Sequence, residues 1–100
     1  MAEGLILEFS EGGEAEYRAV SAHLGVDVES GTGDWPDGLV SHAAGPSSNG
    51  TWVVMEVWSS RETQATFMES RLAAALAAGG ITTVPKVTWV ELAGFHQPGG

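Results

Sequence analysis

An apolar run and an amphipathic run open the chain. Residues 5–9 are apolar and lead into the acidic, glycine-containing residues 10–14, a pattern typical of a strand that enters a turn. Over residues 14–24 apolar side chains recur at helical spacing, and Gly25 follows, where a glycine commonly ends a helix. That stripe consists of Tyr17, Val20 and Leu24. The sequence therefore predicts a strand followed by an amphipathic helix.

The middle of the chain predicts a β-hairpin. Residues 26–38 are rich in glycine and aspartate and lack helical periodicity, which indicates a long surface loop. Two extended-type runs follow, residues 39–44 and 51–58. Asn49-Gly50 between them supplies the positive φ angles that a tight turn requires, so the two strands are expected to pair antiparallel. Asn49-Gly50-Thr51 also matches a glycosylation sequon, but without a secretion signal the turn is the favoured interpretation.

A second helix and a last strand complete the pattern. Ser59, three residues before Glu62, predicts a capping box, and the alanine-rich run continues to Ala78 before Gly79-Gly80. Residues 84–92 alternate and predict a fourth strand, and residues 94–100 predict a frayed tail.

The element order βαββαβ predicts an α+β, ferredoxin-like fold. Right-handed crossovers place two helices on one face of a four-stranded antiparallel sheet. We expect residues 1–100 to form a single domain, because the chain is too short for a second core.

The third strand is apolar on both of its faces. Alternation places Trp52, Val54, Glu56 and Trp58 on one side, and Val53, Met55 and Val57 on the other. Two helices cover only one face of a sheet, so a second subunit is expected to cover the other, most economically in a homodimer. The alternative is that the long loop with Trp35 covers that face.

Charge and composition narrow the classes of partner. The chain has 4 basic and 13 acidic residues, a net charge of −9, which disfavours binding to nucleic acid or to an anionic membrane. It has no cysteine, and no long apolar segment suggests a signal peptide or a membrane span. We expect a soluble cytoplasmic protein.

Four stretches carry a family resemblance: residues 37–46 (DGLVSHAAGP), residues 54–60 (VMEVWSS), Phe67, and residues 71–76 (RLAAAL). They resemble small dimeric α/β-barrel proteins of actinobacteria related to the antibiotic biosynthesis monooxygenase family. The resemblance implies that two sheets pack face to face in a dimeric α/β barrel, with a ligand pocket between each sheet and its helices. It also implies that Trp58 is the family's pocket tryptophan. The sequence departs from the family at Val54, where the oxygenases commonly carry a polar residue, often asparagine.

The second helix and the sheet are predicted to pack face to face, and polar side chains on these two faces suggest acid–base chemistry. On a helical wheel, Gln64 and Arg71 fall within the apolar arc that contains Phe67, so they point toward the sheet and toward Glu56. Arg71 would orient a phenolate or carboxylate, and Glu56 would accept a proton. The alternative is a structural ion pair, or an arginine whose stem packs on the core while its head reaches water. His42, in the second strand, is the histidine best placed for acid–base chemistry, although a purely structural histidine is an open alternative.

The aromatic residues indicate the shape of the ligand. Trp52 and Trp58 offer stacking surfaces, and Tyr17 has a hydroxyl that a pocket would satisfy. Trp35 lies in the glycine-rich loop, where it serves as a lid over the pocket, as an anchor on the partner subunit, or as packing for Pro36. The histidines lack the spacing of metal ligands, and no flavin motif is present, so neither metal nor cofactor is expected.

Two functions follow from these observations. The first is a cofactor-independent monooxygenase-like enzyme, or an isomerase or cyclase, that acts on an aromatic or polyketide-like metabolite. The second is a non-catalytic dimeric binding or regulatory domain whose core side chains fill the pocket. They differ in whether Glu56, His42 and Arg71 converge on a cavity.

Overall fold

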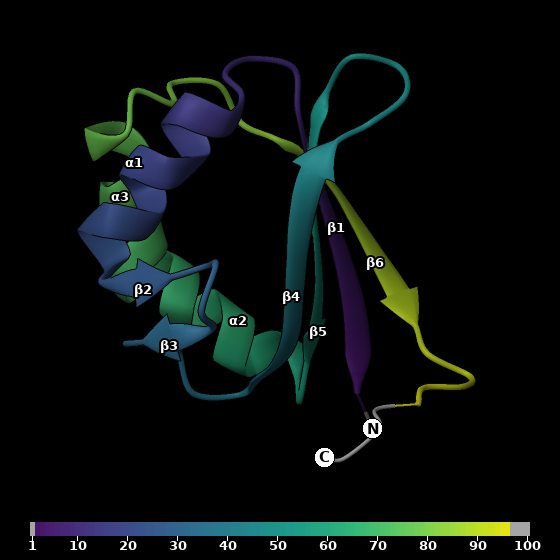
Figure 1. Cartoon of the computed structure of the whole chain (residues 1–100). Coiled ribbons are helices and arrows are strands. Elements are labelled where there is room, and N and C mark those ends of the chain that lie inside the picture. The colour runs from purple at the N-terminus through teal and green to yellow at the C-terminus, as the bar shows by residue number, and fades with distance from the viewer. Residues whose placement is uncertain (1, 97–100) are drawn as a thin grey trace.

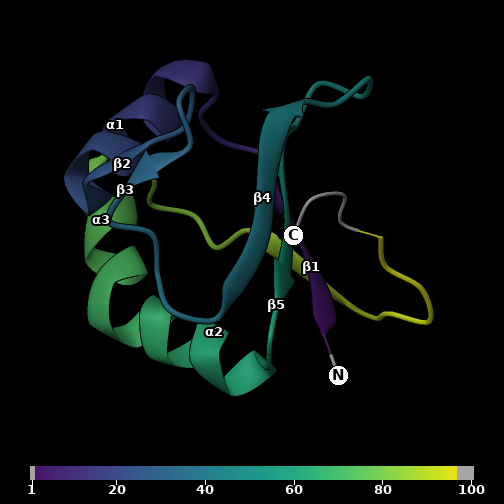
Figure 2. The same cartoon turned by 60° about the horizontal axis from the view of Figure 1, so that its bottom comes forward.

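The computed structural model describes residues 2–96 and has the predicted architecture (Figure 1). Four strands form an antiparallel sheet in the order β4-β5-β1-β6, and the helices cover one of its faces. The view turned by 60° shows the same arrangement, with the helices on one side of the sheet (Figure 2). The elements are β1 Glu3–Phe9, α1 Glu14–Leu24, β2 Val26–Asp27, β3 Thr32–Gly33, β4 Leu39–Pro46, β5 Trp52–Trp58, α2 Arg61–Phe67, a π-helical turn Met68–Leu72, α3 Ala73–Ala78 and β6 Lys86–Glu91. The predicted α+β, ferredoxin-like fold is confirmed.

The predicted β4–β5 hairpin is confirmed, but the connection spans residues 47–51 and only Gly50 of the Asn-Gly pair has a positive φ. Gly50 has a φ of 91°, and its N–H donates to the Ser47 carbonyl at 3.2 Å. The Ser47 N–H donates to the Thr51 carbonyl at 2.8 Å and closes the turn. The left-handed conformation of Gly50 is one that residues with a Cβ rarely adopt, which explains the glycine at this position.

Strand β4 contains one extra residue relative to β5. Leu39 lies opposite Trp58, but Ser41 lies opposite Val57, so Val40 is inserted between two consecutive partners. After this bulge, His42 lies opposite Glu56. Because side chains alternate between faces, the inserted residue turns His42 to the helix-facing side of the sheet.

The two faces of β5 differ as expected. Trp58 and Val54 are 0% and 6% exposed on the helix-facing side, whereas Met55 on the other side is 51% exposed. The alternative that the long loop covers the Met55 face is wrong, because Trp35 lies on the helix side. The helix-facing residues belong to one buried core: Leu5, Leu7, Phe9, Val20, Val54, Trp58, Phe67, Ala75 and Ile81.

Several boundaries differ from the sequence-based expectations. The loop over residues 26–38 contains the short antiparallel pair β2–β3. The cap of the second helix is Ser60, whose side chain accepts the Thr63 N–H, rather than Ser59. That helix is also interrupted by the π-helical turn, which apolar periodicity does not reveal.

The last strand is shorter than predicted at both ends. β6 begins at Lys86, because Pro85 lacks an N–H for the ladder, and it ends at Glu91. Residues 94–96 lie outside any helix or strand, and the remainder of the predicted tail lies outside the described residues. Within residues 2–96, no helix combines the length and the apolar character that a membrane crossing requires.

Gly79, the C-cap of α3, lies against helix α1. A Cβ at this position would lie 2.5 Å from Cγ2 of the buried Val20, although the backbone φ of −82° suits any residue. We therefore expect Gly79→Ala to lower the free energy of unfolding by about 1–3 kcal/mol through overpacking alone. Urea denaturation followed by far-ultraviolet circular dichroism measures this change.

Gly45→Ala is the matched control, because a Cβ there meets nothing within 4 Å. Its free energy of unfolding should stay within about 0.5 kcal/mol of the wild type. Equal stabilities of the two variants would contradict the close contact between the helices.

Candidate functional site

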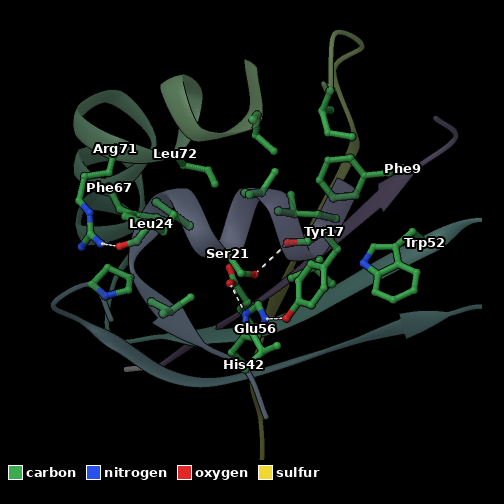
Figure 3. A pocket seen from close by; sticks show the side chains of 18 of the residues that line it. Phe9, Tyr17, Ser21, Leu24, His42, Trp52, Glu56, Phe67, Arg71 and Leu72 are labelled. Atoms are coloured by element: carbon green, nitrogen blue, oxygen red, sulfur yellow. Dashed lines mark hydrogen bonds and ion pairs between the residues drawn. The ribbon is translucent and has the colours of Figure 1, made fainter. Parts of the chain in front are cut away.

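A largely apolar cavity lies between the sheet and the helices (Figure 3). It contains about 760 Å³ of empty space, including its open mouth, so the space is preformed. The residues that line it are Leu7, Phe9, Glu11, Gly13, Tyr17, Val20, Ser21, Leu24, Val26, Val28, Trp35, Pro36, Leu39, His42, Trp52, Val54, Glu56, Phe67, Arg71, Leu72, Leu76 and Ile81.

A chain of hydrogen bonds crosses one side of this cavity. The Tyr17 hydroxyl lies 2.6 Å from Nε2 of His42, and Nδ1 of His42 lies 2.8 Å from Oε2 of Glu56. The side chains of His42 and Glu56 are 16% and 9% exposed. Three elements supply these groups: helix α1 through its apolar stripe, and strands β4 and β5 through their register. Figure 3 shows the three side chains pointing toward one another.

Trp58 determines how Glu56 binds the histidine. Its indole N–H, which only donates, donates to Oε1 of Glu56 at 2.9 Å. The other oxygen, Oε2, then accepts the Nδ1–H of His42 when the carboxylate is ionised. This tautomer leaves Nε2 of His42 as an acceptor for the Tyr17 hydroxyl. Trp58 itself is fully buried and does not line the cavity, so its predicted role as a stacking surface is wrong and it is a positioning residue for Glu56.

The Tyr17 hydroxyl is kept protonated by its surroundings. Burial raises the pKa of Tyr17 above its usual value of 10.0, and the negative charge of Glu56 contributes in the same direction. The ring of Tyr17 stacks parallel to that of His42, with 5.9 Å between centroids and an interplanar angle of 6°. Tyr17 is thus a hydrogen-bond donor at neutral pH.

Arg71 lines the cavity but does not meet Glu56. Its Nη2 donates to the backbone carbonyls of Leu24 at 2.8 Å and Asp34 at 2.7 Å, and it lies 3.3 Å from the Asp34 carboxylate. The guanidinium also lies 5.5 Å from the centre of the Phe67 ring. The sequence-based pairing of Arg71 with Glu56 is therefore wrong, because the end of α1 and the following segment approach the helix and take its donors.

Four further candidates divide between the cavity and the core. Trp35 lines the cavity and packs against His42 at 5.2 Å between ring centroids. Phe67 and Trp52 also line it, and the centroids of the Trp52 and Tyr17 rings are 5.2 Å apart. Gln64 is buried, at 8% exposure, but is not among the lining residues.

The buried indole N–H of Trp52 has no hydrogen-bond partner among residues 2–96. An unpaired buried donor costs about 1–3 kcal/mol, so an acceptor that reached it would be favoured. Figure 3 shows this nitrogen on the edge of the ring that faces Tyr17.

The sequence analysis did not predict two of the polar residues that line the cavity. Ser21 is buried and its hydroxyl donates to the Tyr17 carbonyl at 2.9 Å; its position one turn after Tyr17 was the available signal. Glu11 accepts from the Thr82 N–H at 2.8 Å and from the Thr83 N–H at 3.3 Å. These hydrogen bonds, together with that of the Thr82 hydroxyl, hold the pKa of Glu11 below its usual value. The two threonines lie about 70 residues from Glu11 in the sequence, so no local pattern predicts these contacts.

No group of three or more histidine, aspartate or glutamate side chains within residues 2–96 is arranged to hold a metal ion. His23 is exposed on α1, and His42 is engaged with Tyr17 and Glu56.

Comparison with known proteins finds similarity in the fold. A protein from Chloroflexus aurantiacus assigned as an antibiotic biosynthesis monooxygenase superposes with a TM-score of 0.66 and 18% identity, covering 99% of this chain and 100% of its own. Rv0793 from Mycobacterium tuberculosis gives a TM-score of 0.61 and 19% identity over 98% and 99% of the chains. The Streptomyces coelicolor monooxygenase from ActVA-Orf6, solved with nanaomycin D, gives 0.60 and 20% over 97% and 92%. No protein-family model and no curated protein matches the sequence.

The hydrogen-bond chain predicts an unusual titration of Tyr17. Tyr17 is the only tyrosine, so the near-ultraviolet absorbance of phenolate reports on it alone. We expect its midpoint in the folded protein to lie above 10.0, because burial disfavours the charged form, and to return to the ordinary value on unfolding. Glu56→Gln should lower the midpoint, since it removes a nearby negative charge.

The same shift predicts a loss of stability at alkaline pH. The folded state holds the Tyr17 proton more tightly than the unfolded state, so stability is complete below the ordinary pKa and falls as pH rises through the folded pKa. Tyr17→Phe removes this part of the alkaline slope. A Tyr17 midpoint at or below 10.0 in the folded wild type would contradict the buried arrangement.

Proposed function

We propose that this protein binds a small aromatic molecule that carries a hydroxyl group, and that His42, supported by Glu56, removes the hydroxyl proton. The observation that carries the proposal is the Tyr17–His42–Glu56 chain in the wall of a preformed apolar cavity. An apolar pocket with a few convergent polar groups is the usual form of a small-molecule site. The alternative of a pocket filled by core side chains is disfavoured by the empty space.

The geometry supports His42 as the base. Glu56 fixes the Nδ1 proton, so Nε2 presents its lone pair to the cavity side, where Tyr17 now donates. A ligand hydroxyl that replaces Tyr17 at this nitrogen, or passes its proton through the Tyr17 hydroxyl, delivers the proton to His42. The resulting imidazolium is stabilised by the Glu56 carboxylate, as in other histidine–carboxylate pairs.

The charges favour a ligand that is neutral when it enters. Glu56 and Glu11 both line the cavity as acids, and Arg71 is engaged by Leu24 and Asp34. A ligand carboxylate would therefore meet repulsion without a free cation. A phenol or hydroxyquinone loses its proton only after it is bound, and a carbonyl on it would satisfy the Trp52 N–H.

We propose further that the reaction is a cofactor-independent monooxygenation, with dioxygen as co-substrate. The phenolate formed at His42 passes an electron to dioxygen, and the two radicals combine to a carbon-bound peroxide. His42 returns the proton to the peroxide, and loss of the ring C–H proton with cleavage of the O–O bond gives a quinone and water. One aryl C–H and one O–H are oxidised, one oxygen atom enters as carbonyl, and the other leaves as water. The nanaomycin D bound by the Streptomyces relative supports an aromatic polyketide as the substrate class.

The working form is proposed to be a homodimer joined through the uncovered sheet face. The register places Ile6, Met55 and Ala43 side by side on this face, and Val90 lies on the same side of β6. Ile6, Met55 and Val90 are 36%, 51% and 40% exposed. An apolar sheet face of this kind is stabilised when the same face of a second copy covers it.

His42→Gln tests the base. By isothermal titration calorimetry, wild-type protein should bind 1-naphthol, and the substitution should weaken binding about tenfold through loss of one hydrogen bond to the hydroxyl. 1-Methoxynaphthalene, which lacks the donor, should bind both proteins equally. His23→Gln is the matched control, because this histidine is exposed on α1, and it should leave both affinities unchanged.

Oxygen consumption then separates catalysis from binding. Wild-type protein that consumes dioxygen with 1-naphthol and releases 1,4-naphthoquinone supports the oxygenase, with His42→Gln inactive. Binding without consumption supports the non-catalytic binding domain instead. Absence of saturable binding to either naphthalene would overturn the proposed site.

Met55→Lys tests the dimer. A lysine in the centre of the uncovered face places like charges together across a two-fold axis, so we expect sedimentation velocity at micromolar concentration to show dimers for the wild type and monomers for the variant. Val84→Lys is the control, since Val84 is exposed on the loop before β6. Monomeric wild-type protein would contradict the pairing.

A further inference from the structure

The segment between α1 and β4 forms part of the cavity wall on the helix side of the sheet. It runs from Gly25 at the end of α1 through β2 and β3 to Trp35, and both views show it on the helix side of the sheet (Figures 1 and 2). Val26, Val28 and Trp35 from this segment line the cavity. It therefore forms part of the cavity wall although it is made of two-residue strands.

Trp35 lines both the cavity and a second hollow on the outside of the protein. This outer hollow is lined by Val28, Gly31, Trp35, Leu39, Val40, Ser41 and His42, and four of these, Val28, Trp35, Leu39 and His42, also line the cavity. The Trp35 ring packs against His42, and its N–H donates to the carbonyls of Gly31 and Thr32, both at 3.1 Å. A movement of this side chain would connect the two spaces beside the proposed base.

Arg71 ties the two ends of the segment to the helix layer. A single nitrogen, Nη2, donates to the Leu24 carbonyl before the segment and to the Asp34 carbonyl just before Trp35. Leu24 is the last residue of α1, where the helix dipole favours a cation. Arg71 itself lies in the π-helical turn, a local irregularity that is frequent at functional positions.

The rest of the segment is built to move. Gly25, Gly31 and Gly33 have φ angles of 81°, 74° and 113°, so glycines with left-handed backbone stand at both of its ends and in its turn. β2 and β3 pair over two residues each, and the Asp34 N–H donates to the Gly25 carbonyl at 2.9 Å. These contacts hold the shape of the segment, whereas Arg71 joins it to the helix that carries Phe67 and the cavity wall.

We infer that Arg71 is a positioning residue that latches residues 25–35 over the cavity and thereby keeps Trp35 as the gate through which the ligand reaches His42. The gating role rests on the proposed function, whereas the latch itself is a property of the unliganded protein. Arg71 thus acts through Trp35 rather than on the substrate, which distinguishes it from the catalytic role that the sequence suggested.

The latch is tested without any ligand by fluorine NMR of protein labelled with 5-fluorotryptophan. The four tryptophans give four resonances, and Trp35→Phe identifies that of Trp35. In Arg71→Met we expect the Trp35 resonance to broaden or to shift toward its position in unfolded protein, while that of the buried Trp58 stays in place. Arg71→Lys keeps the charge on a side chain that is one atom shorter, so its nitrogen reaches the two carbonyls less well, and it should give an intermediate shift.

Asp34→Asn is the matched control. It removes the charged partner but leaves both carbonyls that Arg71 binds, and the Asp34 side chain is 79% exposed. Its Trp35 resonance should match the wild type. A Trp35 resonance unchanged in Arg71→Met would overturn the latch. If Arg71→Met unfolds, with all four resonances collapsing together, Arg71→Lys decides, and an unchanged Trp35 resonance in that variant would overturn it equally.

The gate is tested by stopped-flow binding of 1-naphthol, followed by tryptophan fluorescence. Arg71→Met should raise both the association and the dissociation rate constants about tenfold, with a smaller change in affinity, because opening no longer limits passage. Unchanged rate constants together with a mobile Trp35 would overturn the gate and leave the latch in place. Wild-type protein that does not bind 1-naphthol would overturn the proposed function and the gate with it, whereas the NMR result on the latch would stand.

Discussion

The hydrogen bond between His42 and Glu56 is the interaction on which the candidate site depends. Both side chains are largely buried, and a buried carboxylate is unfavourable unless its oxygens are satisfied. Here one oxygen accepts from His42 and the other from the Trp58 indole. The largest fully buried side chain of the core is thus also the group that holds the acid in place. Core packing and site chemistry are joined at Trp58.

The positions of the other groups of the site depend on the His42–Glu56 pair. With Glu56 fixed, His42 has one free nitrogen, and Tyr17 reaches it from the helix layer. The segment over residues 25–35 forms one wall of the cavity, and Arg71 binds the carbonyls of Leu24 and Asp34 near its two ends. Proteins that share only 18–20% identity with this chain have a similar fold, so the backbone tolerates wide changes in sequence. The identity of the side chains in the cavity, not the architecture, is therefore the basis for any statement about the substrate.

Sequence reasoning succeeded where a local period determines the outcome. Alternation along β5 placed Val54, Glu56 and Trp58 on the helix-facing side, and the apolar stripe of α1 placed Tyr17 opposite them. It failed where contacts depend on segments that are distant in the chain. Arg71 binds the end of α1 and Asp34 instead of Glu56, because the approach of that segment has no local signature. Gln64 and Trp58 were placed on the correct face, but their depth depends on three-dimensional packing, and they belong to the core rather than to the cavity.

The extra residue in β4 has a consequence for how such a site arises and disappears. If Val40 paired with Val57 instead of forming a bulge, strand alternation would bring Ser41 opposite Glu56 and turn His42 to the uncovered sheet face. The pairing of this one residue thus decides whether an imidazole or a hydroxyl stands in the wall of the cavity, while the buried core keeps its sequence. β4 is an edge strand of the sheet, so one neighbour rather than two constrains its register. A shift of β4 by one residue against β5 is therefore a short route by which a fold of this kind gains or loses an acid–base group.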